Sequence, residues 1–264
     1  MAGVDVANLR RVVLGSALAA TTVQTATAVL ALRRGRRDYA DAAWGPGLAA
    51  IALTGAAVGS GDGLRRWALA AATTAWAARL AREMTTRIAA SDDEDPRYQE
   101  FLGDDDTFAV VSKVFVTQGL AQLLVSAPIQ LAAASTLPRT RRRWLFPAGV
   151  GAMVGGAVIE TLADHQKATF KNQTTDKSEI LDRGLWAWSR HPNYFGDSLF
   201  WDGAWLAAAA STRGPWTFPA PALMSYLLIV ATGAKRTENR MQERPAYRDY
   251  QRRVAFFFPR PPKP

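Results

Sequence analysis

The sequence predicts an all-α fold, a polytopic integral membrane bundle of about seven transmembrane helices, and two observations lead to this prediction. The first is a series of apolar runs, several near the ~20 residues that a membrane span requires, with little of the amphipathic alternation of a soluble helical bundle. The second is that Lys and Arg gather between the runs, so the mean hydropathy of -0.08 blends very apolar with very basic segments. The predicted spans are Val12–Leu32, Ala42–Gly59, Trp67–Leu80, Phe108–Leu137, Trp144–Ala163, Leu199–Ala210 and Trp216–Ala234.

The three N-terminal spans are the weakest of the series. All three are rich in Ala and Thr, and the third is also short. The first could be read as a signal peptide, but the basic run RRGRR at 33–37 follows it, where a small-residue cleavage site would be expected. We therefore predict that the first span is retained.

The later spans carry polar groups near or inside their apolar stretches. Gln118 lies inside the fourth span, and the fifth leads into a polar stretch that begins at Glu160. The sixth span is short unless it extends backward through Tyr194. After the seventh, the tail FFFPRPPKP cannot form a regular helix, because Pro removes backbone donors and fixes φ. We predict a single domain over residues 1–264, with a cofactor-binding half at approximately 144–264.

The basic residues give an independent test of this map. Of the 32 Lys and Arg, 21 lie in the even-numbered segments between spans and 9 in the odd-numbered ones. An excess of Lys and Arg marks the cytoplasmic side of a membrane. We therefore predict an N-terminus outside and a C-terminus in the cytoplasm, and we expect the membrane to be a bacterial inner membrane.

Composition excludes several classes of site. The chain has no Cys and only two His, so disulfides and thiolate metal sites are excluded, and we predict no metal site. A net charge of +9 would suit nucleic acid, but the basic residues are distributed as membrane-flanking segments. The partners we expect are membrane lipids and small molecules, with no nucleic acid.

The densest polar cluster is the segment SRHPNYFGD, which stands just before an apolar run. Ionisable groups at membrane depth are costly and therefore indicate functional sites. The position of this cluster is suited to holding a charged cofactor beside an apolar substrate. Its candidate binding residues are Arg190, His191, Asn193, Tyr194 and Asp197.

Two further groups of residues extend this candidate site. Glu160 and Asp164 are four residues apart and share one helical face, with Lys167 and Lys171 following within two turns. Carboxylates would accept from the hydroxyls or amides of a nucleotide, and lysines would meet its phosphates; the alternative is a charged helix end in water. Glu238 and Tyr247 lie in a C-terminal basic stretch that could equally be a membrane-surface helix.

At these residues the chain resembles the DUF1295 family of the membrane steroid 5-alpha-reductase and sterol C14-reductase superfamily. The segments that carry the resemblance are GLW with SRHPNYFGD, DYADAAWG, DPRY, VFVTQG, ETLADHQKATFK and PAYRDYQRRVAFFFP, spread along most of the chain. The resemblance implies NADPH as hydride donor and reduction of an activated carbon–carbon double bond in a steroid, sterol or other lipid. The steroid reductases carry a glutamate in a QELPS-like motif that is missing here, so Asp41 or Tyr39 is the positional stand-in for a catalytic group.

Two other functions fit part of the pattern. Isoprenylcysteine methyltransferases also have an RHPxYxG motif followed by a Glu and a Tyr-rich C-terminal helix, which would imply S-adenosylmethionine as cofactor. The Glu160-to-Lys171 stretch favours the reductase, because a dinucleotide requires a longer polar cleft. A non-catalytic lipid-binding membrane protein would keep the fold without turnover.

Overall fold

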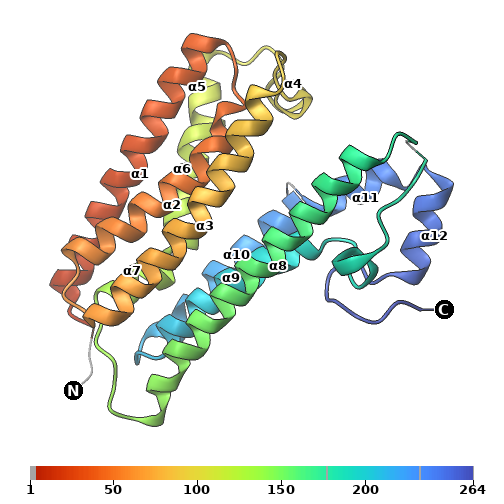
Figure 1. Cartoon of the computed structure of the whole chain (residues 1–264). Helices are drawn as coiled ribbons and strands as arrows, with labels where there is room; N and C mark the ends of the chain where they lie inside the picture. The colour runs from red at the N-terminus through yellow and green to blue at the C-terminus, as the bar shows by residue number, and fades with distance from the viewer. Residues whose placement is uncertain (1–3, 177, 232, 264) are drawn as a thin grey trace. The chain divides into compact units, whose positions relative to one another are not determined.

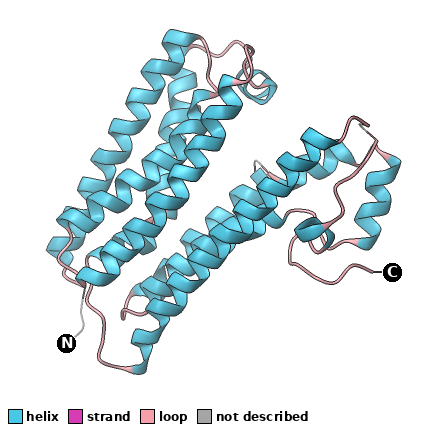
Figure 2. Cartoon of the chain, in the orientation of Figure 1, coloured by secondary structure: helices cyan, strands magenta, loops and turns pink. Residues whose placement is uncertain are grey.

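The computed structural model describes residues 4–176, 178–231 and 233–263, and every regular element within them is a helix (Figure 2). The predicted all-α class is therefore confirmed. An isolated backbone bridge between Val4 and Ser135 is the single β-type pairing in the described residues. The helices are α1 (Val6–Arg34), α2 (Tyr39–Val58), α3 (Gly63–Ala89), α4 (Pro96–Leu102), α5 (Thr107–Val110), α6 (Thr117–Val125), α7 (Ala127–Ala133), α8 (Leu145–Gln173), α9 (Pro192–Ala209), α10 (Pro219–Tyr226), α11 (Ala234–Met241) and α12 (Pro245–Arg253).

The chain divides into two compact units, and the single domain over residues 1–264 stays a prediction. The first unit is Met1–Val150 with Trp205–Ala220, and the second is Gly151–Ala204 with Pro221–Pro264. The second unit covers most of the half that was predicted to bind a cofactor.

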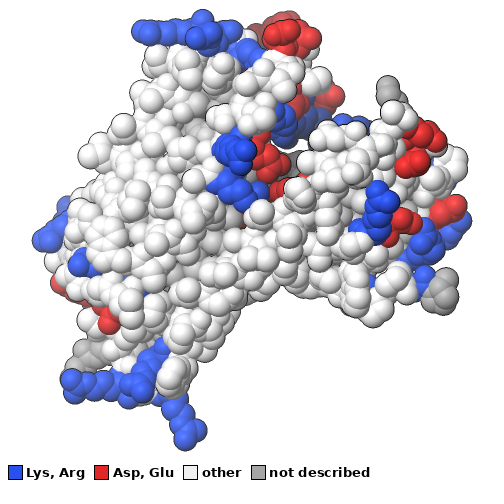
Figure 3. Space-filling model, in the orientation of Figure 1, with Lys and Arg blue, Asp and Glu red and all other residues white. Residues whose placement is uncertain are grey.

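Four helical stretches of the described residues are long and apolar enough to cross a membrane: Val6–Arg34, Thr107–Val125, Arg141–Gln173 and Gly214–Met241. The other three predicted spans fall in α2, α3 and α9, which do not reach the same combination of length and hydropathy, so the count of seven is not confirmed. Residue 232 of the seventh predicted span lies outside the described residues. On the face shown in Figure 3, charged side chains lie in separate groups between large uncharged areas.

The fourth predicted span is interrupted. A continuous helical stretch, including a π-helical turn at Val111–Val116, ends at Val125, and the separate short α7 follows Ser126. Pro128 lies in the first turn of α7. Backbone N–H groups in the first turn have no partner within the helix, so the N–H that proline lacks costs no helical hydrogen bond. A uniform apolar run therefore divides into two helices at a proline that hydropathy alone does not register.

In the first unit, α1 and α3 flank α2, and α6 and α7 pack against them (Figure 1). At one end of this bundle, the backbone N–H of Gly61 donates to Ala133 O at 2.8 Å. At the other end, Arg37 pairs with Glu94 at 2.6 Å. The segments between helices thus alternate between two ends, which is the alternation on which the charge count depends.

A buried amide pair joins three helices of this unit. Gln24 Nε2 donates to Gln122 Oε1 at 3.0 Å, and Gln122 Nε2 donates to the carbonyls of Ala43 and Trp44 at 3.0 and 2.9 Å. Gly47 makes room for the amide, since a Cβ there would lie 2.2 Å from Gln122 Nε2. Polar side chains in an apolar bundle need partners, and these are supplied across helices.

In the second unit, α8 and α9 cross with their backbones almost touching. A Cβ on Gly156 would lie 2.5 Å from Gly196 O, and a Cβ on Gly196 would lie 2.6 Å from Glu160 N. Small residues allow such an approach, because any side chain would hold the helices apart. This crossing aligns the polar end of α8 with the start of α9.

Candidate functional site

The site begins with a tight turn that is fixed onto α8. The turn Gly184–Ala187 opens at Gly184, whose φ of 63° is in the left-handed region that favours glycine. Gln166 Oε1 accepts from the backbone N–H of Leu185 at 3.0 Å, and Trp186 Nε1 donates to Ala163 O at 3.0 Å. Lys167 lies over the Trp186 ring at 5.7 Å. The GLW segment of the sequence therefore places an indole beside the last turns of α8.

The next residues are held by the C-terminal tail. Arg190 N–H donates to Ala255 O at 2.9 Å, and Ser189 Oγ donates to Phe257 O at 2.7 Å. The Phe256 ring meets the His191 ring edge-on at 5.3 Å. The tail is not helical, as predicted, and the rings of Phe257 and Phe258 each meet Phe195 of α9 edge-on, with Phe257 buried and Phe258 exposed. Pro192 then opens α9 at the position where Pro is best tolerated.

Glu238 on α11 connects these segments. Its Oε1 accepts from Arg190 Nε at 3.0 Å and from Tyr247 OH at 2.6 Å, and lies 2.9 Å from His191 Nε2. Its Oε2 accepts from Arg190 Nη2 at 2.9 Å and from Gln251 Nε2 at 2.7 Å. Burial and the bond to Glu238 raise the pKa of Tyr247, so its hydroxyl stays a donor. The carboxylate of α11 is therefore the shared acceptor of α12 and the RHP segment.

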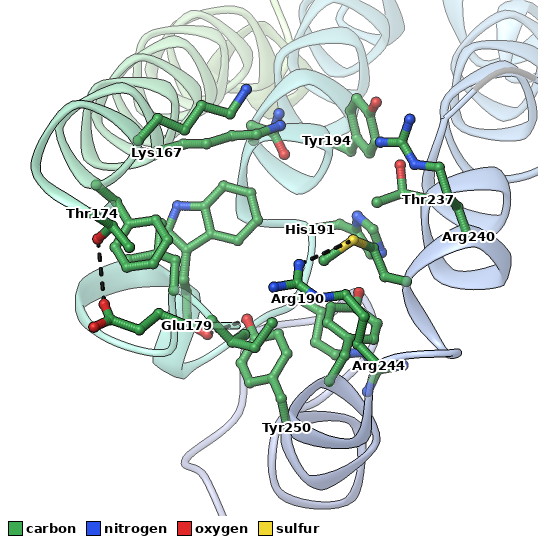
Figure 4. A pocket seen from close by; sticks show the side chains of 18 of the residues that line it. Lys167, Thr174, Glu179, Arg190, His191, Tyr194, Thr237, Arg240, Arg244 and Tyr250 are labelled. Atoms are coloured by element: carbon green, nitrogen blue, oxygen red, sulfur yellow. Dashed lines mark hydrogen bonds between the residues drawn. The ribbon is translucent and has the colours of Figure 1, made fainter. Parts of the chain in front are cut away.

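Next to this cluster lies a cavity of about 610 Å³, within the ~300–1,000 Å³ range of small-molecule sites. α8 supplies Lys167 on one side, and α11 supplies Thr237 and Arg240 on another (Figure 4). The cationic lining residues outnumber the acidic ones. The cationic ones are Lys167, Lys171, Arg190, Arg240 and Arg244, and the acidic ones are Asp176 and Glu179.

Aromatic rings form part of the wall. His191 stacks on Tyr194 with ring centroids 5.8 Å apart. Tyr194 in turn lies against Gly233, where a Cβ would come within 2.9 Å of the ring. Trp186 and Tyr250 also line the cavity, and Tyr250 OH donates to Trp186 O at 2.6 Å. The cavity therefore combines flat apolar faces with positive charge, which is the combination that a nucleotide requires.

Most of the predicted binding residues line this cavity, and the others lie behind its wall or beside the α8–α9 crossing. Seven of the predicted residues line the cavity: Lys167, Lys171, Arg190, His191, Asn193, Tyr194 and Tyr247. The other four do not line it. Asp164 accepts from Asn193 Nδ2 at 3.0 Å, Glu238 lies behind Arg190 and His191, and Glu160 and Asp197 are buried beside the α8–α9 crossing.

The predicted catalytic pair lies in the first unit, in a network of charges at one end of the bundle. Asp41 accepts from Arg87 at 2.5 Å, Arg97 at 2.8 Å and Tyr98 at 2.7 Å. Burial and the neighbouring Asp41 raise the pKa of Tyr98, so its hydroxyl remains a donor to that carboxylate. With three donors, the Asp41 carboxylate is committed to holding the α3–α4 segment.

Tyr39 lies in the same network and is also engaged. The Arg36 guanidinium is 5.9 Å from the centre of its ring. The ring packs on a cluster that includes Ala28, Ala40 and Phe115. A catalytic role for either Asp41 or Tyr39 stays a prediction. The contacts of both residues hold α2 to the neighbouring helices of the first unit.

Several lining residues were missed by sequence reasoning. Thr174, Asp176, Glu179, Ile180 and Leu181 belong to the segment between α8 and the GLW turn, which shows no periodicity. Thr237, Arg240 and Arg244 recur every three or four residues, a helical spacing that could have indicated one face.

Comparison with known proteins places the chain in a family. Residues 28–254 match the family described as "Protein of unknown function (DUF1295)". The uncharacterized protein C594.04c of Schizosaccharomyces pombe is 33% identical over 78 residues, which cover 29% of this chain and 23% of that protein. No solved structure matches the chain. Since the family match extends over most of the sequence, this protein belongs to the DUF1295 family.

Proposed function

We propose that the protein is an integral membrane oxidoreductase that uses NADPH to reduce an activated carbon–carbon double bond of a steroid, sterol or other lipid. The observation that carries this proposal is the cavity of the second unit, where cations from α8 and α11 converge beside aromatic rings. When bound, the nucleotide would supply the hydride, and the protein would bind and orient it.

The residues of the cavity fit such a nucleotide. Lys171, Arg240 and Arg244 are the candidates for its phosphates, because Lys offers a point charge and Arg a planar fork. Trp186 and Tyr194 offer flat surfaces for its rings. The hydroxyl of Thr237 and the amide of Asn193 suit sugar or carboxamide groups, and Asp164 fixes the Asn193 amide from behind.

The cationic lining also favours this function over the alternatives. S-adenosylmethionine has no phosphate and carries a positive sulfonium beside its single carboxylate, so a methyltransferase site would use fewer cationic side chains than a site for a dinucleotide phosphate. Titration of the purified full-length protein with NADPH and with S-adenosylmethionine separates the three functions. If the protein binds neither of the two ligands, the proposal is contradicted.

Replacement of both Arg240 and Arg244 by Ala is expected to weaken NADPH binding by about 1–3 kcal/mol for each phosphate contact that is lost. If either residue reads the 2′-phosphate, NADH affinity will fall less than NADPH affinity, because NADH lacks that group. Calorimetric titration of both nucleotides measures the difference. Arg248→Ala, which removes an exposed cation on α12 that does not line the cavity, is the matched control and should leave both affinities unchanged.

We further propose seven membrane spans, with the N-terminus outside and the cavity and C-terminus in the cytoplasm, where nucleotides are found. The 21-to-9 division of Lys and Arg supports this orientation. A reporter that is active only in the cytoplasm should give a signal when fused after the last residue, and none when fused before the first. The reverse result would place the cavity on the wrong side for a nucleotide.

A further inference from the structure

We infer that Glu238 is a positioning residue, which does not touch the ligand but fixes the Arg190 guanidinium and the His191 imidazole in the wall of the cavity. The sequence alone groups Glu238 with the cofactor-binding residues. Glu238 does not line the cavity, whereas Arg190 and His191 do. The inference rests on the proposed nucleotide site for its effect on binding, but its effect on His191 is independent of any ligand.

The hydrogen bonds of Glu238 leave it no capacity for a ligand. Its two oxygens meet five nitrogen or oxygen atoms from four side chains, at distances of 2.6 to 3.0 Å. The side chain is 11% exposed. An ionised carboxylate offers about four lone-pair sites, so the network already saturates it. A ligand would have to displace one of these partners to reach it.

The same network assigns the proton of His191. Oε1 of Glu238 also accepts from Arg190 Nε and Tyr247 OH, which marks it as an acceptor. His191 Nε2, at 2.9 Å, must then be the donor, and the imidazole carries a proton on Nε2. A carboxylate partner of this kind fixes both the tautomer and the orientation of a histidine ring. The stack on Tyr194 and the edge contact with Phe256 complete the confinement of the ring.

Arg190 is fixed in a corresponding way. Its Nε and Nη2 form a two-pronged pair with Glu238, and its Nη1 donates to the backbone carbonyls of Gln251 and Val254 at 3.1 and 2.6 Å. All three guanidinium nitrogens are thus engaged by the protein. Arg190 therefore contributes a fixed positive charge to the cavity wall, while the two-pronged contacts to phosphate fall to Arg240 or Arg244.

The test uses the two histidines, which differ sharply in environment: His191 is 3% exposed, and His165 is an exposed residue of α8. In full-length protein labelled with 15N-histidine, the His191 signals should show a proton on Nε2, shifted downfield by its carboxylate acceptor. His165→Gln identifies the second set of signals. Glu238→Gln keeps the shape of the side chain but replaces the charged acceptor by a neutral one, so the Nε2 proton should move upfield.

Glu238→Gln should also raise the NADPH dissociation constant by about 10- to 100-fold, as is typical when a side chain that orients the ligand-binding groups is lost, because Arg190 and His191 would no longer be fixed in the cavity wall. Glu243→Gln, at an exposed carboxylate five residues further along, is the control and should change neither the proton signal nor the affinity. An unchanged His191 signal with a weakened affinity would mean that Glu238 contacts the ligand directly. If neither changes, Glu238 has no positioning role. Absence of NADPH binding by the unmodified protein would contradict the proposed function but leave the His191 result valid.

A second variant keeps the test decisive if Glu238→Gln does not fold. Tyr247→Phe removes one of the donors that share Oε1, so the remaining bond from His191 should strengthen and its Nε2 proton should move downfield. Opposite shifts in the two variants are expected from a shared acceptor. If the Nε2 proton signal does not move in Tyr247→Phe, His191 and Tyr247 do not share Oε1 of Glu238 as an acceptor.

Discussion

Arg190→Met is expected to lower the free energy of unfolding by about 3–5 kcal/mol, because removing one partner of a buried ion pair leaves the other charge uncompensated. The side chains of Arg190 and Glu238 are only 10% and 11% exposed. Met has a similar length and no charge, so the loss reports the ion pair and the bonds of Arg190 to the carbonyls of Gln251 and Val254 rather than a cavity. Chemical denaturation in detergent, followed by tryptophan fluorescence, measures the change.

The matched control for this prediction is an exposed ion pair of the same unit. Arg253 pairs with Asp182 at 3.1 Å, with side chains 45% and 43% exposed. Such a pair contributes about 0–1 kcal/mol, so Arg253→Met should be close to neutral. Equal effects of the two substitutions would show that the Arg190–Glu238 pair does not stabilise the unit.

Gly156→Ala is expected to destabilise the second unit by about 1–3 kcal/mol or more, the usual cost of overpacking a close contact. The added methyl group would lie 2.5 Å from Gly196 O and 2.6 Å from Phe200 N, and both are backbone atoms of α9 that cannot turn aside. The two helices would have to separate, which also moves Asn193 and Tyr194 relative to Lys167. Both the melting temperature and nucleotide affinity should therefore fall.

The neighbouring residue provides the control. A Cβ on Gly155 would meet nothing within 4 Å, so Gly155→Ala adds the same methyl group to the same helix without a clash. Because Ala is the better helix former, this variant should be neutral or more stable by up to about 1 kcal/mol. A loss of stability in Gly155→Ala similar to that in Gly156→Ala would point to lipid packing rather than to the α8–α9 crossing.

Part of the site could be predicted because its residues are close in sequence or repeat with a helical period. The RHPNYFGD segment and the Lys167–Lys171 stripe are examples, and both reach the cavity. The role of Glu238 could not be predicted, because binding the ligand and holding a ligand-binding residue require the same kind of side chain. Only the positions of Arg190, His191, Tyr247 and Gln251 around it distinguish the two.

Asp41 illustrates the same limit. Its place at the start of an apolar helix made it the positional stand-in for a catalytic group, whereas its partners Arg87, Arg97 and Tyr98 come from segments more than forty residues away. A sequence shows which side chains can pair, but chain folding selects the partners. The division of the fourth predicted span at Ser126 is a further case. Hydropathy indicates whether a segment prefers lipid or water, but it does not indicate where a helix ends.

The sequence by itself determined the all-helical class, the apolar character of the long helices and membership of the DUF1295 family, because these depend on local composition, periodicity and motif. Only the tertiary structure decided which polar residues surround a cavity and which stand behind it. The physical reason is that a hydrogen bond or ion pair depends on distances of about 3 Å between atoms, and these are set by helix crossings such as that of Gly156 and Gly196.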